Sequence, residues 1–272
     1  MASLNAAEHF GFDRDIGGIA PGRWADFLVL PDLRTVRPEM VVAQGRLVAR
    51  EGQCLVSCPD VPMPAGLYRG PLPEPLDPSA LRLAAAGSRA RVRVIRIAGD
   101  ILTAESEATL LVHDGAVLAH PASDLLLAAV CGRRAGLGLG IIAGFGLREG
   151  AVASTLSFET ADMVLVGASR EVARGRCPAG RRDRGGFVVV DGRGAVCAEL
   201  PLPLGGIATP ASVPDVAHRL ETVTGALRDL GSTLDRPLLT LQTLTFSAIP
   251  ALRLTTRGLL AVKSREHVPA LL

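Results

Sequence analysis

Aromatic side chains are scarce in this sequence, which has one Trp, one Tyr and seven Phe among 272 residues. Its charge is nearly balanced, because 29 Lys and Arg stand against 27 Asp and Glu and leave a formal net charge of +2. Proteins that hold nucleic acid stack bases on aromatic rings and surround the backbone with positive charge. The composition therefore argues against a nucleic-acid partner, while a hydrophobic content of 48% supplies a globular core.

Features of exported or membrane-bound chains are also missing. The N-terminal segment has no basic start followed by an apolar block, and no apolar run approaches the ~20 residues of a membrane helix. The odd number of cysteines has no framework spacing, which predicts free thiols in a reducing cytoplasm. No second Cys or His pair accompanies Cys54 and Cys58, which favours two ordinary thiols over a zinc site. The cysteines are Cys54, Cys58, Cys131, Cys177 and Cys197.

Motifs for hydrolytic chemistry are lacking as well. Metal-dependent hydrolases need ligands that converge on one point, but the histidines here form neither HxH nor HExxH. There is no GxSxG, and no Cys can be matched by spacing to a His and an acid. From the residues alone we nominate no catalytic residue and no metal ligand. The five histidines are His9, His113, His120, His218 and His267.

The N-terminal residues predict a small β unit. A short helix is expected over residues 3–11, with Ser3 or Asn5 as its cap and Gly11 as its stop. Residues 25–30 form a compact apolar strand after a Pro-Gly turn, and VVAQGRLVAREG predicts two strands about a turn at Gly45.

Prolines separate this unit from the rest of the chain. They are frequent from residue 59 onward and exclude both helix interior and sheet pairing, so 59–84 is interpreted as a linker or surface strap. Several β-rich stretches and two helices, at 123–133 and 213–230, predict one α+β domain over 85–272. The second helix has apolar residues at helical spacing, which indicate one buried face.

Two further stretches are open to functional interpretation. The glycines of GRRAGLGLG, residues 132–140, lack the GxGxxG spacing of a dinucleotide site, which favours close packing or tight turns. The arginine-rich stretch ARGRCPAGRRDRGG, residues 173–186, lacks the spacing of a phosphate-binding loop and is interpreted as a solvated loop.

Several long stretches of the sequence are similar to segments of a known family. LNAAEHFGFDRDIGGIAPGRWADFLVL resembles the closing signature of the amidohydrolase superfamily, where the last barrel helix leads into a small β-sandwich. RVRVIRIAGDILT, IIAGFGLREGAVASTLS and GGFVVVDGRGAVCAELPLPLGGIAT resemble the C-terminal domain of bacterial adenine deaminases. The resemblance implies an α+β chain of three parts: a barrel-helix and β-sandwich segment at 1–58, a linker at 59–84, and an adenine deaminase C-terminal-like domain at 85–272.

The resemblance also implies a reaction. The intact family hydrolyses adenine to hypoxanthine and ammonia with a divalent metal, of manganese or iron type, inside a (β/α)8 barrel of roughly 250 residues. The barrel ligands, including the HxH pair, have no counterpart in this sequence, so no cofactor is expected in this chain.

A polar loop of the family, reading A-H-D-S-H-N, matches residues 157–162 here. Both of its histidines are replaced, one by Phe158 and the other by Ala161, so imidazole chemistry and metal ligation do not carry over. The remaining candidate positions of the loop are Glu159, Thr160 and Asp162.

Three readings follow. The chain is a C-terminal portion of an adenine deaminase without activity of its own, or a non-catalytic binding module or subunit of a split deaminase, or, least favoured, an autonomous deaminase with a rebuilt site. Residues 1–55 would leave open strand edges and an apolar patch, which predicts a barrel-bearing partner chain or self-association. The family has an alanine-rich helix where 173–186 stands, a replacement that a pair of compensating frameshifts would produce.

Overall fold

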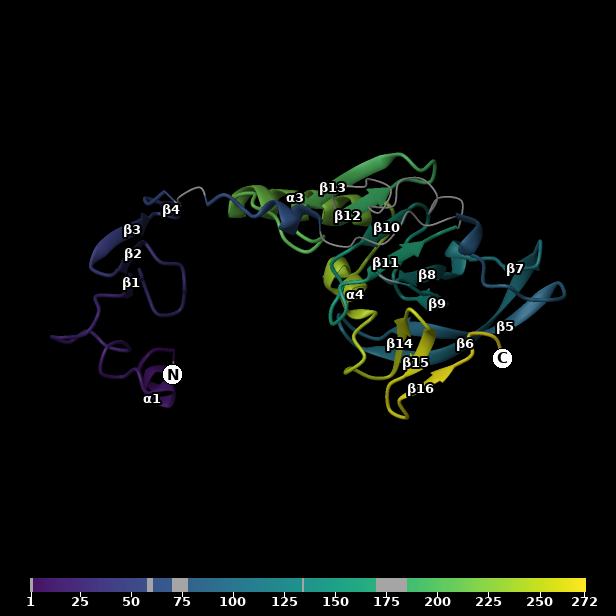
Figure 1. Ribbon diagram of the computed structural model, residues 1–272, viewed down its shortest axis with the longest axis horizontal. Coiled ribbons are helices and arrows are strands. Elements are labelled where there is room, and N and C mark those ends of the chain that lie inside the picture. Colours follow the sequence, from purple (N-terminus) through teal and green to yellow (C-terminus); the bar gives the residue numbers. More distant parts are fainter. Residues whose placement is uncertain (1, 58–60, 70–77, 134, 170–184) are drawn as a thin grey trace. The chain divides into compact units, whose positions relative to one another are not determined.

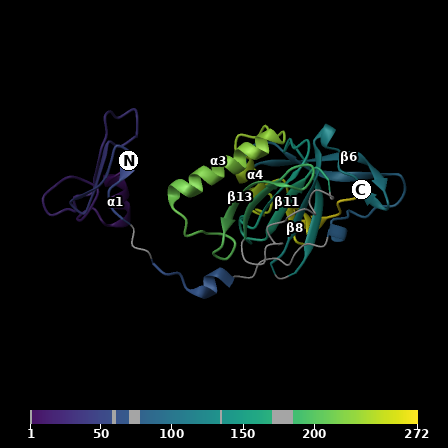
Figure 2. The same ribbon diagram turned by 90° about the horizontal axis from the view of Figure 1, so that it is seen from above.

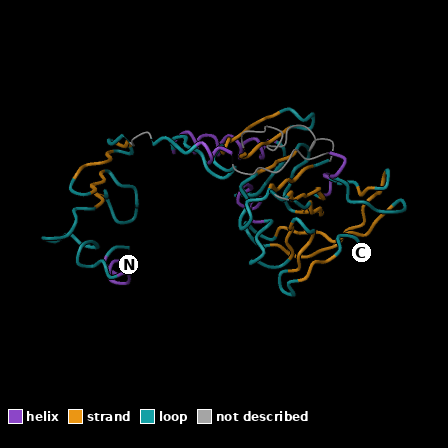
Figure 3. Tube along the Cα trace, viewed as in Figure 1, coloured by secondary structure: helices purple, strands orange, loops and turns teal. Residues whose placement is uncertain are grey.

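The computed structural model describes residues 2–57, 61–69, 78–133, 135–169 and 185–272, and the chain divides into two compact units, Met1–Pro62 and Met63–Leu272 (Figure 1). Strands outnumber helices in both of them (Figure 3). No helix among the described residues is long and apolar enough to cross a bilayer.

The first unit consists of one short helix and one small antiparallel sheet. Helix α1 (Leu4–Phe10) ends at Gly11, whose φ of 74° is the left-handed conformation that glycine adopts readily. The four strands lie in sequence order and are β1 (Phe27–Val29), β2 (Met40–Ala43), β3 (Arg46–Arg50) and β4 (Gln53–Cys54). Gln44 and Gly45, with φ of 50° and 75°, turn β2 into β3 as in a type I′ hairpin. The predicted helix and both predicted strands around Gly45 are confirmed.

The second unit is built on a nine-stranded sheet. Its order is β13-β12-β10-β11-β8-β9-β5-β6-β7, and every neighbouring pair is antiparallel except β5 with β9. The outer strands on one side are β5 (Arg89–Ile97), β6 (Thr103–His113) and β7 (Ala116–Val117). The remaining strands are β8 (Leu125–Cys131), β9 (Leu137–Ala143), β10 (Ala151–Ser154), β11 (Met163–Gly167), β12 (Gly185–Val190) and β13 (Val196–Leu202).

The helix predicted over residues 123–133 is wrong. A 3-10 turn η3 (Pro121–Ser123) leads into β8, which pairs with β9 on one side and β11 on the other. Its side chains alternate between two hydrophobic clusters, so that Leu126 and Ala128 face one and Leu127 and Ala129 face the other. A short apolar run buried on both faces has no distinctive period, and only its partners decide between strand and helix.

Two helices and a small sheet cover one face of the large sheet. Helix α3 (Val213–Asp229), the longest helix among the described residues (Figure 2), packs on β13 and β12 and buries Val223 and Leu227. The Ser212 hydroxyl caps it by accepting from the Asp215 N–H at 3.3 Å. The predicted helix over 213–230 is therefore confirmed. The other elements on this face are α4 (Pro237–Thr243), β14 (Leu252–Thr255), β15 (Gly258–Ala261) and β16 (Glu266–Val268).

Arg253 lies inside this layer and is fully buried. Its guanidinium donates to the backbone carbonyls of Ile249, Thr243, Ile101 and Pro250 at 2.6–3.2 Å. Burial lowers the pKa of Arg253 to about 10. The side chain joins the end of α4, β14 and the loop before β6 through one group.

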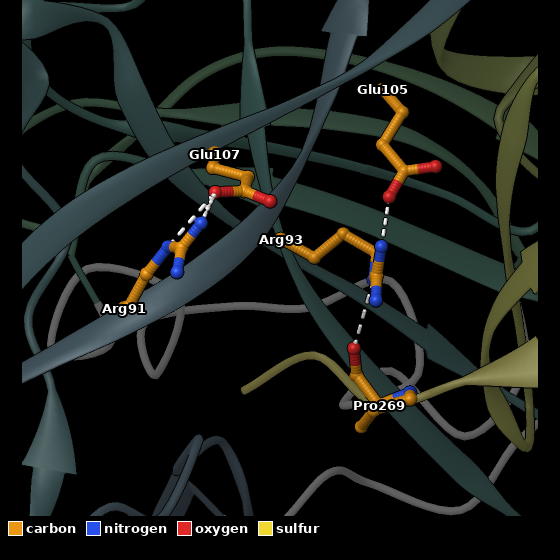
Figure 4. A network of polar contacts seen from close by, with 5 residues as sticks. All are labelled: Arg91, Arg93, Glu105, Glu107 and Pro269. Atoms are coloured by element: carbon orange, nitrogen blue, oxygen red, sulfur yellow. Dashed lines mark hydrogen bonds and ion pairs between the residues drawn. The ribbon is translucent and has the colours of Figure 1, made fainter. Parts of the chain in front are cut away.

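The last residues run beside β5. The Leu272 N–H donates to the Arg91 carbonyl, and the Arg93 N–H donates to the Ala270 carbonyl, at 2.9 and 2.8 Å. On the same strand Arg91 pairs with Glu107, and Arg93 pairs with Glu105 while its Nε donates to the Pro269 carbonyl (Figure 4). We call residues 269–272 the C-terminal latch.

The region predicted as a linker, 59–84, contains two 3-10 turns, η1 (Ala65–Arg69) and η2 (Pro78–Ala80). Leu81 follows η2 and is buried in the second hydrophobic cluster of the sheet. Residues 173–184 of the arginine-rich stretch lie outside the described residues, while Gly185 and Gly186 begin β12.

Candidate functional site

The polar loop at residues 157–162 connects β10 to β11 and is closed upon itself. The Ser157 hydroxyl donates to the Asp162 carbonyl at 2.7 Å, and the Ala161 N–H donates to the Ser157 carbonyl at 3.2 Å. Glu159 and Ala161 have φ of 79° and 51°, a left-handed conformation that is uncommon for residues with a side chain. Two such residues within six give the loop a tight, defined course.

The end of α4 and the segment after it hold one side of this loop. The Phe158 N–H donates to the Gln242 carbonyl at 3.1 Å, and the Phe158 ring meets Phe246 edge-to-face with centroids 6.0 Å apart. Both carboxylate oxygens of Glu159 accept from Ser247, one from its N–H at 2.8 Å and the other from its hydroxyl at 2.7 Å. The Glu159 carboxylate is thereby fixed in place.

Arg133 holds the other side. Its backbone N–H donates to Oδ1 of Asp162 at 3.0 Å, and its guanidinium donates to the carbonyls of Ala161 and Gly205. Burial lowers the pKa of Arg133, and the nearby Asp162 charge opposes that effect. Burial, with the Asp162 charge in the same direction, raises the pKa of the Cys131 thiol. Cys131 is therefore a thiol at neutral pH and not an activated nucleophile.

A pocket of about 760 Å³ opens beside the loop. Its walls come from three parts of the second unit: the loop itself, residues 245–248 after α4, and the strands and turns of the β14-β15-β16 sheet. The lining residues are Glu159, Thr160, Asp162, Thr245, Ser247, Ala248, Thr255, Thr256, Arg257, Leu260, Val262, Arg265 and His267.

Three of the five loop positions identified by the resemblance line this pocket, namely Glu159, Thr160 and Asp162. Phe158 instead packs on Phe246, and Ala161 contributes its carbonyl to Arg133. The sequence reasoning missed Ser247, which lies 88 positions after Glu159, and gave no role to Arg257, Arg265 or His267. No local pattern signals these residues, since they reach the pocket only through tertiary packing.

Clusters of possible metal ligands are absent from the described residues. Nowhere in 2–57, 61–69, 78–133, 135–169 and 185–272 do three His, Cys, Asp or Glu side chains converge to hold a metal ion.

The glycines of residues 132–140 are explained by packing, as predicted. A Cβ on Gly138 would overlap the Thr255 carbonyl oxygen, and one on Gly140 would lie 3.0 Å from the Leu259 side chain. The glycines allow β9 to approach the β14-β15 hairpin that forms one wall of the pocket.

Known proteins resemble this chain along nearly its whole length. The sequence model of the adenine deaminase C-terminal domain matches residues 100–266, and that of the amidohydrolase family matches residues 1–48. An adenine deaminase of Moorella thermoacetica is 40% identical over 266 residues, covering 94% of this chain and 44% of that protein. Adenine deaminases of Methanothrix thermoacetophila and Methanothermobacter thermautotrophicus are 35% and 36% identical, covering 99% and 98% of this chain.

This chain spans about half the length of the curated relatives it matches, between 44% and 49% for the three just named. The order of the two matched segments, amidohydrolase before adenine deaminase C-terminal domain, is that expected from the sequence. The chain belongs to the adenine deaminase C-terminal domain family.

Proposed function

We propose that this chain acts as the C-terminal portion of an adenine deaminase, in which a metal-bearing (β/α)8 barrel supplied by other residues hydrolyses adenine to hypoxanthine and ammonia. The observation that carries the proposal is the match of nearly the whole chain to about half of each of several proteins named adenine deaminase. Under this proposal the chain serves adenine catabolism and purine salvage in the cytoplasm, and it is inactive without the barrel.

The surface of the first unit supports a barrel-bearing partner. Among described residues 2–57 only Ala7 is buried, although the unit carries many large apolar side chains. A hollow of about 540 Å³ lies between α1 and β1 and is lined by Phe10, Phe12 and Ile19 among others. Apolar surface left open to water on this scale favours association. The exposed large apolar residues of the unit are Leu4, Phe10, Phe12, Ile19, Trp24, Leu28, Leu33, Val36, Leu47, Leu55, Val56 and Val61.

A second candidate function is a non-catalytic binding module. The pocket beside the 157–162 loop favours it, because this pocket lies wholly within the second unit and needs no barrel to form. The two functions are compatible, and they differ in whether adenine turnover appears when a barrel is supplied.

The test is reconstitution. The purified chain is assayed for release of ammonia and hypoxanthine from adenine, with manganese or iron, alone and after co-expression with the N-terminal half of the Moorella thermoacetica protein. We expect turnover and a stable complex only in the combination. Turnover by the chain alone would instead establish an autonomous deaminase. If the combination gave neither a complex nor turnover, the non-catalytic binding module would be the remaining candidate function.

Two substitutions sharpen the test. Phe10→Ser and Trp24→Ser alter the exposed apolar surface of the first unit, and we expect them to weaken the complex. Ile101→Ser, at an exposed apolar side chain of the second unit, is the matched control and should leave the complex unchanged. Self-association of residues 1–55 in place of a barrel complex would appear as concentration-dependent dimers in sedimentation.

A further inference from the structure

We propose that the pocket beside the 157–162 loop binds a small phosphate ester, with Arg257 and Arg265 as the anion-binding groups. Both arginines line the pocket from turns of the β14-β15-β16 sheet. Both are exposed, and within the described part of the chain neither guanidinium has an ion-pair or hydrogen-bond partner. Guanidinium groups bind phosphate oxygens through two parallel N–H donors.

The acidic groups of the pocket accept hydrogen bonds from neutral donors of the protein, so they keep their charge but have partners within the chain. Both oxygens of Glu159 accept from Ser247, and Oδ1 of Asp162 accepts from the Arg133 N–H. The charged groups without an internal partner are thus the two arginines. A ligand that meets these free groups carries negative charge.

His267 extends the same wall. The Thr255 hydroxyl lies 3.0 Å from the Gly258 carbonyl, which can only accept, so its one proton points there. The hydroxyl oxygen therefore accepts from Nε2–H of His267 at 3.1 Å and from the Arg257 N–H at 3.1 Å. This contact fixes the ring.

The size and lining of the pocket favour an ester over a bare anion. Its volume of about 760 Å³ lies in the range of small-molecule sites. Leu260 and Val262, both half-buried, offer apolar surface next to the cationic groups, and Thr160 and Thr256 add hydroxyls. A phosphate would occupy the arginines while an organic group covers the apolar wall.

This inference concerns ligand binding by the second unit and does not depend on adenine turnover. Its measurement uses the full chain without any barrel partner. Failure of the inference would therefore leave the deaminase proposal standing, and the reverse also holds.

The test is titration calorimetry of the full chain with adenosine 5′-monophosphate, ribose 5-phosphate, adenosine and inorganic phosphate. We expect both esters to bind, adenosine not to bind, and inorganic phosphate to bind more weakly than either ester. Arg257→Gln and Arg265→Gln should each weaken ester binding by about tenfold or more, since each removes charged hydrogen bonds that contribute roughly an order of magnitude or more in affinity. Arg257→Lys keeps the charge without the planar fork and should lose less.

One control separates this proposal from a general effect of charge. Arg89→Gln removes an exposed arginine of β5, away from the pocket lining, and should leave ester binding unchanged. Binding of adenosine as tightly as the nucleotide, equal affinity of the arginine variants and the parent chain, or an equal loss of affinity in Arg89→Gln would each overturn the proposal.

Discussion

The two units of this chain differ in how far they bury their apolar side chains. In the described residues 2–57 a single side chain, Ala7, is buried, whereas the second unit contains two hydrophobic clusters on the two faces of one sheet. The strands of the first unit have two to five residues, and β5 and β6 have nine and eleven. Short strands in a small sheet cannot enclose a core. The second unit therefore has a hydrophobic core of its own, whereas the described residues of the first unit leave their large apolar side chains partly or largely exposed.

The largest expected effect is at Arg253. Arg253→Ala removes the donors to four backbone carbonyls and leaves a cavity in the layer over the sheet. We expect a loss of about 3–5 kcal/mol in the free energy of unfolding. Urea denaturation followed by circular dichroism measures it. The exposed Arg89→Ala should change stability by less than about 0.5 kcal/mol. A loss at Arg253 as small as that of the control would show that the second unit does not depend on this contact.

A matched pair of leucines tests the comparison directly. Leu126 is fully buried in the second unit, and Leu33 is 91% exposed in the first. We expect Leu126→Ala to lower the free energy of unfolding by about 2–5 kcal/mol and Leu33→Ala to change it by less than about 0.5 kcal/mol. The same denaturation experiment measures both. Similar losses at the two sites would contradict the view that only the second unit has a core of its own.

The C-terminal latch should contribute less to the free energy of unfolding than Arg253 or Leu126. Removal of residues 270–272 breaks the two backbone hydrogen bonds to Arg91 and Arg93 and exposes part of the second cluster, which Leu271 covers. The expected loss is about 1–3 kcal/mol, measured as a lower midpoint of denaturation. Arg91→Gln, which breaks only the exposed pair with Glu107, should cost at most about 1 kcal/mol. If Arg91→Gln lowered the free energy of unfolding more than the truncation does, the ion pair on β5 would contribute more to stability than the C-terminal latch.

The smallest effect is a pH response in the first unit. The backbone N–H groups of Thr35 and Arg34 donate to the Asp32 carboxylate and lower its pKa from 3.8. A depressed carboxylate pKa gives a contribution that is complete above pH 3.8 and is lost as the pH falls through the lower folded value. The amide shifts of Thr35 and Arg34 in NMR should titrate there, and Asp32→Asn should remove the transition. Unchanged shifts across this range would contradict the contact.

Local signals in the sequence identified several elements correctly. Helix α3 has a Ser cap, a proline in its first turn and apolar residues at helical spacing, all within one segment. The hairpin at Gln44 and Gly45 needs only a turn that tolerates positive φ. Residues 125–131 carry no such local signal, and the helix expected there is the central strand β8 because β9 and β11 supply its hydrogen bonds.

The candidate site likewise contains residues that the sequence indicates and residues that only the tertiary structure brings together. The family resemblance located the 157–162 loop, and the replacement of its histidines by Phe158 and Ala161 is plain from the residues. Ser247 and the two pocket arginines lie 88 or more positions beyond Glu159, and no spacing rule connects them to it.

By itself, the sequence determined the family, the lack of metal-ligand motifs, and those elements whose caps, turns and periodicity lie within one segment. Tertiary structure decided which apolar run became the middle of a sheet and which side chains line the pocket. It also decided that the first unit buries almost nothing of its own. The physical reason is that hydrogen-bond partners and burial are supplied by distant parts of the chain, so a segment's own residues do not contain that information.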